Sequence, residues 1–74
     1  MKYMAHIFDV DDNGSIITST ETVNIYESKT EQQALEVSEK LRKSRDINEP
    51  LKSGEQYICN TWELDNENNM IKQI

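Results

Sequence analysis

The sequence is poor in the residues that cross-link a chain or build loops around a ligand. Its 74 residues include one cysteine, Cys59, one proline, Pro50, and two glycines, Gly14 and Gly54. A single cysteine excludes an internal disulfide and any site that needs several thiolate ligands from one chain. Two isolated glycines exclude a glycine-rich phosphate-binding loop, and no apolar run approaches the length of a membrane span. We therefore predict a protein of the reducing cytoplasm that needs no cofactor.

Apolar residues are also scarce. They make up 35% of the chain, and 74 residues are close to the lower limit for a domain that folds around its own core. The sequence therefore predicts a single domain over residues 1–74 with a thin core, which dimerisation or a tightly bound partner would stabilise.

Basic residues are few, with 8 Lys and Arg against 14 Asp and Glu, and the net charge is −6. This charge argues against direct nucleic-acid binding, which needs Lys and Arg to neutralise phosphates. The negative charge is uneven: it sums to −4 over residues 1–27, +1 over residues 28–52 and −3 over residues 53–74. The net negative charge therefore belongs to the predicted strands and their turns, and not to the predicted helix.

The middle of the chain, Ser28 to Arg45, is predicted to be a helix. Two pairs have the spacing at which a hydroxyl caps a helix N-terminus, Ser28 with Glu31 and Thr30 with Gln33. We prefer Thr30 as the N-cap, because no glycine or proline occurs from Glu31 to Lys43. One helical face carries mostly small side chains, which would let it lie close to a sheet. The residues of that face are Ala34, Val37, Ser38 and Leu41.

Segments rich in β-branched and aromatic residues flank this helix. The predicted strands are Tyr3–Val10, Ser15–Glu27, Glu55–Leu64 and Met70–Ile74. The second is long for one strand, so we expect a kink near Thr20–Thr22. In the connector after the helix, Ile47 and Leu51 are predicted to fill the edge of the core. The order β-β-α-β-β predicts an α+β fold, a four-stranded antiparallel sheet with one helix packed on one face.

An acidic turn is predicted within each pair of strands. Residues 8–17 align without gaps with residues 62–71. Both segments have the same order of residue types: an aromatic residue, an acid, an aliphatic residue, Asp, a polar turn and two apolar residues. We interpret this similarity as two hairpins built alike rather than as a duplication. A helix that crosses the sheet to a parallel strand would put the two turns at opposite ends, whereas a connector that doubles back would put them together.

No residue pattern predicts catalysis. The only histidine, His6, and Cys59 lie within predicted strands, where structural roles are commoner than reactive ones. The segment from Asp9 to Ile16 matches the first half of an EF-hand calcium loop, but Thr20 stands where the loop needs Glu, and a strand rather than a helix precedes it. We therefore prefer the hairpin turn to the calcium loop, and predict no enzyme activity and no metal site.

The acids instead favour binding, since spaced carboxylates can engage Arg and Lys side chains that would otherwise hold phosphates. In length, acidity and its runs Asp9–Asp12 and Glu63–Glu67, the chain resembles small acidic phage-encoded inhibitors of bacterial nucleic-acid enzymes, including anti-CRISPR proteins. The resemblance implies an inhibitor that engages a basic surface of a partner protein such as a CRISPR or other defence nuclease. The predicted partner-binding residues are Asp9, Asp11, Asp12, Glu63, Asp65 and Glu67.

The alternative is a structural or regulatory module whose exposed sheet face or edge strand forms a homodimer. Met70–Ile74 could pair with a second copy as an exposed edge strand. The acids would then serve only to keep a small protein soluble.

Overall fold

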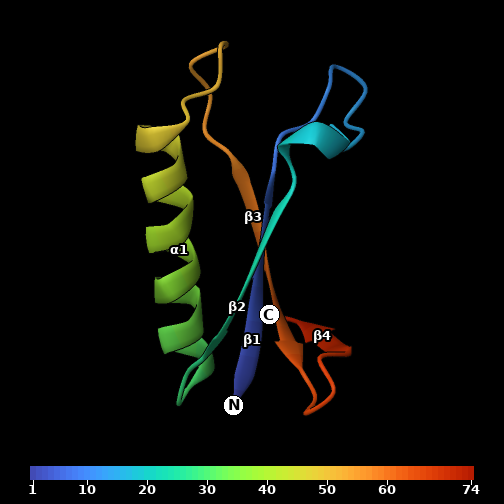
Figure 1. Ribbon diagram of the computed structural model, residues 1–74, viewed down its shortest axis with the longest axis vertical. Helices are drawn as coiled ribbons and strands as arrows, with labels where there is room; N and C mark the ends of the chain where they lie inside the picture. The colour runs from blue at the N-terminus through green and yellow to red at the C-terminus, as the bar shows by residue number, and fades with distance from the viewer.

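The computed structural model describes all 74 residues, and its elements follow the predicted order (Figure 1). The strands are β1 (Lys2–Phe8), β2 (Thr22–Glu27), β3 (Ile58–Leu64) and β4 (Met70–Gln73), the helix is α1 (Glu31–Asn48), and a short 3-10 helix, η1 (Thr18–Thr20), precedes β2. Every pair of neighbouring strands is antiparallel, in the order β2-β1-β3-β4. The predicted α+β fold with a four-stranded antiparallel sheet is confirmed.

The first strand is at the centre of the sheet. β1 pairs with β2 from Lys2 opposite Glu27, and with β3 from Lys2 opposite Leu64. Since β2 and β3 both run antiparallel to β1, they are parallel to each other, and α1 makes the crossover between them. The Asp9–Ser15 loop and the 65–69 turn consequently lie at opposite ends of the long axis (Figure 1), so the helix-crossing alternative is the correct one.

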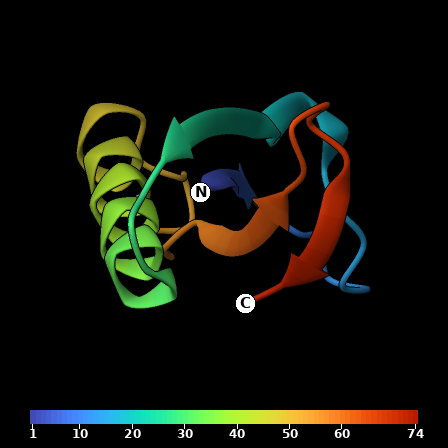
Figure 2. The ribbon, with the colours of Figure 1, turned by 90° about the horizontal axis from the view of Figure 1, so that it is seen from below.

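The helix covers one face of the sheet. Figure 2 shows α1 on one side of the sheet and no α-helix on the other. Side chains of β1 alternate between the faces, and Tyr3, Ala5 and Ile7, which face α1, are buried. Ala34 and Ser38 of the helix are buried against them, as their small size predicts. Only 10 of the 74 residues are buried, which agrees with the prediction of a thin core.

A chain of buried hydroxyl groups joins the helix to the sheet. Thr61 Oγ1 donates to Ser38 Oγ at 2.7 Å, and Ser38 Oγ lies 2.6 Å from the Tyr26 hydroxyl. The Tyr26 hydroxyl donates to the carbonyl of Ala34 at 2.7 Å, so its single proton is used there and the Ser38 hydroxyl is the donor to Tyr26. Three elements, β2, α1 and β3, are thereby tied together inside the protein.

The helix begins as predicted and ends later than predicted. The Thr30 hydroxyl accepts from the backbone N–H of Gln33 at 3.1 Å. The helix continues to Asn48 rather than Arg45, because Pro50 restricts the residue before it, Glu49, and not the preceding turn. The prediction that Ile47 fills the core is wrong, since it is 79% exposed on the extended helix.

The inward position near the helix end belongs instead to a charged residue. Arg42 is only 8% exposed and bridges the carboxylates of Glu39 and Asp46. The second oxygen of Asp46 accepts from the backbone N–H of Tyr57 at 2.9 Å. This partly buried ion cluster attaches Tyr57, the residue before β3, to α1.

The long second segment is interrupted, as the kink prediction requires. Val10 and Ile16 form an isolated bridge, and β2 itself begins only at Thr22. Between them, Thr20 Oγ1 accepts from the backbone N–H of Asp9 at 2.9 Å and donates to the carbonyl of Ile17 at 2.6 Å. Thr20 therefore holds the loop after β1 beside the start of β2.

Candidate functional site

The first acidic turn is closed by one of the predicted partner-binding residues. Asp11 Oδ1 accepts from the backbone N–H groups of Asn13 and Ser15, both at 2.9 Å. Gly14, at φ 81°, supplies the left-handed residue that lets the chain return, and its N–H bonds to the carbonyl of Asp11 at 3.0 Å. The Asp11 carboxylate is thus part of the turn itself.

The second acidic turn has the same hydrogen bonds. Asp65 Oδ1 accepts from the backbone N–H groups of Glu67 at 2.8 Å and Asn69 at 2.9 Å, and Asn68 takes the left-handed conformation at φ 68°. The N–H of Asn69 is the main reason that the pKa of Asp65 lies below its ordinary value. The alignment of residues 8–17 with 62–71 therefore reflects two copies of one turn design.

Four acids lie in the segment between β1 and β2, and we call this region the acidic end. They are Asp9, Asp11, Asp12 and Glu21. None of them forms an ion pair with Lys or Arg, and Glu21 Oε2 is 2.9 Å from His6 Nε2. Asp12 is exposed, and no side-chain hydrogen bond occupies it.

The opposite end is less negative, because a lysine lies over its turn. Lys2 Nζ donates to Asn68 Oδ1 at 2.8 Å and to the carbonyl of Asn66 at 3.4 Å. The positive charge of Lys2 also contributes to the lowered pKa of Asp65. Glu67 and Glu27, which are exposed and form no ion pair, are acids that remain at this end.

The sixth predicted residue, Glu63, belongs to neither end. It points to the helix-covered face, where its side chain is 16% exposed and lies 3.9 Å from Lys72 Nζ. Lys72 also forms a 2.8 Å ion pair with Glu31 at the start of α1. The structure therefore brings Asp9, Asp11 and Asp12 together, puts Asp65 and Glu67 at the far end, and sets Glu63 beside Lys72, the residue that joins β4 to the helix.

The face of the sheet opposite α1, which we call the uncovered face, is largely apolar. Val23 and Ile25 of β2 are 53% and 50% exposed there, and the β-sheet register puts Met4 and Trp62 beside Ile25 on the same face. The sequence did not identify this surface, because both faces of β1 are apolar and periodicity alone does not say which one the helix covers. The small residues on the helix were the available signal, since they match a sheet face that includes Ala5.

The two residues with reactive side chains are held apart. His6 lies on the uncovered face, its ring centroid 4.7 Å from that of Phe8. Cys59 is opposite Ile7 on the helix-covered face, where burial raises the pKa of its thiol. Because they occupy opposite faces of the sheet, these two side chains cannot form a nucleophile–base pair. No group of three or more His, Cys, Asp or Glu side chains converges as a metal site would require.

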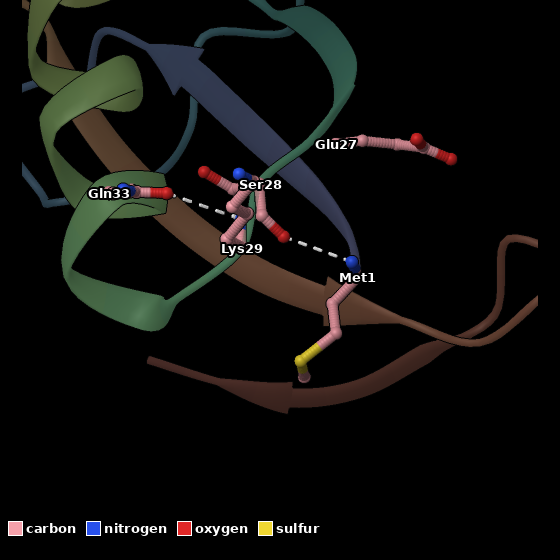
Figure 3. Close-up of a pocket in the computed structure, with 5 residues that line it drawn as sticks. All are labelled: Met1, Glu27, Ser28, Lys29 and Gln33. Atoms are coloured by element: carbon pink, nitrogen blue, oxygen red, sulfur yellow. Dashed lines mark hydrogen bonds between the residues drawn. The ribbon is translucent and has the colours of Figure 1, made fainter.

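A shallow hollow of about 460 Å³ lies where β2 joins the helix (Figure 3). Its lining is Met1, Glu27, Ser28, Lys29 and Gln33. The terminal ammonium of Met1 donates to the carbonyl of Ser28 at 2.9 Å, and the N–H of Lys29 donates to Gln33 Oε1 at 3.3 Å. Glu27 extends away from the other four (Figure 3), so the hollow has no convergent set of polar groups with which to orient a small molecule.

Comparison with known proteins adds no relative: no protein-family model, curated protein or solved structure matches this chain. No helix has the length and apolar character that crossing a membrane requires.

Proposed function

We propose that this protein acts by binding, without catalysis, to a basic surface of a partner protein, and that it inhibits that partner by occupying the surface. The observation that carries the proposal is the position of the acidic end beside the uncovered face. Four acids without Lys or Arg partners adjoin a sheet face that exposes Val23 and Ile25. An apolar centre with a charged rim is the anatomy of a protein-binding surface.

Charge favours a basic partner over a second copy. Both ends of the uncovered face carry unpaired acid, from Asp12 at one end to Glu67 at the other, and the net charge is −6. A second copy laid on this face would bring like charges together, whereas Arg and Lys side chains of a nucleic-acid-binding channel would meet carboxylates. Enzymes that hold nucleic acid in such channels, including defence nucleases, are the partner class that fits.

Affinity capture with matched charge variants tests the proposal. The tagged protein is used to capture partners from nuclease-treated bacterial lysate, and the captured protein is then purified for direct binding measurements. Asp12→Lys and Glu67→Lys reverse exposed acids that close no turn through their side chains. Glu36→Lys makes the same charge change on the exposed helix and is the control.

We expect the captured protein to have a basic surface and to lose its own nucleic-acid binding when the wild-type protein is added. Asp12→Lys should weaken binding roughly fivefold, the effect of about 1 kcal/mol, whereas Glu36→Lys should leave it unchanged. Raised salt should weaken wild-type binding more than Asp12→Lys binding. Equal affinities of the Asp12→Lys and Glu36→Lys variants for the partner would contradict the proposal. A partner that still binds nucleic acid in the complex would contradict it as well.

A further inference from the structure

One edge of the sheet, the outer side of β2, has backbone groups without partners. Met1 and Ser28 exchange both of their backbone hydrogen bonds, each at 2.9 Å. Bonded and non-bonded pairs alternate along an antiparallel ladder, so the register makes Tyr26 and Asn24 bond to β1. The residues between and beside them, Val23, Ile25 and Glu27, consequently direct their N–H and C=O groups away from the sheet, where no loop or side chain bonds to them.

The other edge of the sheet is protected, and β2 is not. β4 has four residues, a β-bulge in its pairing with β3 and an ion-paired lysine, Lys72, which are devices that prevent edge-to-edge pairing. β2 has six residues, regular pairing over its whole length, and no Lys or Pro. A regular, unguarded edge is the template to which an extended segment adds in β-augmentation.

The side chains along this edge define what such a segment must carry. Alternate residues Glu21, Val23, Ile25 and Glu27 give the order acid, apolar, apolar, acid. The contact of Glu21 with His6 and the pairing of His6 with Val23 put this series on the uncovered face. Side chains directly opposite each other across strands form the stabilising pairs, so the complement is basic, apolar, apolar, basic at alternate positions.

We propose that β2 accepts an extended segment of the partner protein as a fifth strand, and that this segment carries Lys or Arg opposite Glu21 and Glu27 and apolar residues opposite Val23 and Ile25. The inference rests on the proposed function and specifies how the partner is held. Because the order is symmetric, the segment could run in either direction. A second copy fits less well, since the register that pairs Val23 with Ile25 of a two-fold-related copy also sets Glu21 against Glu27.

A synthetic peptide tests this directly. The probe is a capped heptapeptide of sequence Lys-Thr-Val-Thr-Val-Thr-Lys, and the control peptide has Glu in place of both Lys. Each is titrated at low salt into ¹⁵N-labelled protein up to about 1 mM, which detects dissociation constants up to about 1 mM. The readouts are amide chemical shifts and amide hydrogen exchange. We expect the amides of Val23, Ile25 and Glu27 to shift and to exchange roughly tenfold more slowly near saturation.

A pair of variants separates strand addition from simple charge attraction. Val23→Pro removes one outward N–H and leaves the bonds of β2 to β1 intact, since proline is tolerated on the open side of an edge strand. Val23→Thr keeps the N–H and is the control. We expect the Lys peptide to bind Val23→Thr and to lose roughly tenfold in affinity for Val23→Pro.

Equal binding of the Lys peptide and the Glu peptide would overturn the inference, and so would chemical shift changes spread over the acidic end without slowed amide exchange at β2. Slowed exchange that grows with protein concentration alone would also overturn it, because it would assign the edge of β2 to a second copy. The proposed function is judged separately. If Val23→Pro captures the same basic partner as the wild type, the partner is real and strand addition at β2 is wrong.

Discussion

Replacing Ser38 with alanine should remove the centre of the buried hydroxyl chain. The substitution deletes the acceptor of Thr61 and the donor to Tyr26. The Tyr26 hydroxyl keeps its bond to the carbonyl of Ala34, but the hydroxyl of Thr61, a residue that is 4% exposed, loses the acceptor to which it donates. The cost is therefore larger than that of an exposed hydrogen bond.

Two lost bonds at about 0.5–1.5 kcal/mol each, plus the unpaired Thr61 hydroxyl, predict a destabilisation of about 2–3 kcal/mol for Ser38→Ala. A domain of this length has a total stability of about 4–11 kcal/mol, so the loss is a large fraction of the whole. With an m-value of about 1 kcal/mol per molar urea, the unfolding midpoint should fall by about 2–3 M.

The assay is urea unfolding followed by circular dichroism, with Thr61→Val and the double variant as controls. Thr61→Val replaces the hydroxyl by a methyl group of similar size, so it removes the unpaired donor that Ser38→Ala leaves behind. The loss of unfolding free energy in the double variant should therefore be smaller, by about 1 kcal/mol, than the sum of the losses in the two single variants. Additive losses, or a loss below about 1 kcal/mol for Ser38→Ala, would refute the reasoning.

Three further predictions concern the turns and the thiol. The folded pKa of Asp65 lies below its unfolded value of about 3.9. The stability that the ionised Asp65 contributes is therefore complete above the unfolded pKa and is lost as the pH falls through the folded pKa. Acid unfolding should show this loss in the wild type and not in Asp65→Asn. Gly14→Ala, at φ 81°, should cost about 1 kcal/mol in thermal unfolding, whereas Asn68→Gly, at φ 68°, should not destabilise the protein. Cys59 should react with a thiol reagent at pH 8 much more slowly in the folded protein than in denaturant, and equal rates would contradict its burial and raised pKa.

Local sequence signals predicted the parts of the fold that depend on neighbouring residues. Thr30 and Gln33 mark the start of the helix, and Asn13-Gly14 the first turn, because caps and turns are built from adjacent residues. The kink before β2 followed from the length of the segment alone.

Signals that depend on distant residues were missed. Arg42 takes an inward place that periodicity gave to apolar residues, because Glu39 and Asp46 neutralise it and the distant N–H of Tyr57 fixes Asp46. Ile47 is exposed as a consequence of where Pro50 ends the helix.

The candidate site was predictable only as a set of acids. Sequence does not distinguish a carboxylate that closes its own turn, such as Asp11 or Asp65, from one that is free to meet a partner, such as Asp12. The separation of the two turns depends on the crossover through α1, and the open edge of β2 depends on strand order, neither of which a local pattern encodes.

The central place of β1 has a consequence for how the chain folds as it is made. β1 precedes its second neighbour, β3, by the whole of β2 and α1, and Lys2 finds its partner on that side only at Leu64. During translation the hairpin of β1 and β2 is complete early, yet it has nothing to cover Tyr3 and Ile7 until the helix has emerged and β3 has followed it. The core can therefore close only after β3 has left the exit tunnel, so the cooperative folding step comes after synthesis of almost the entire chain, and until then the emerged chain exposes its most apolar strand.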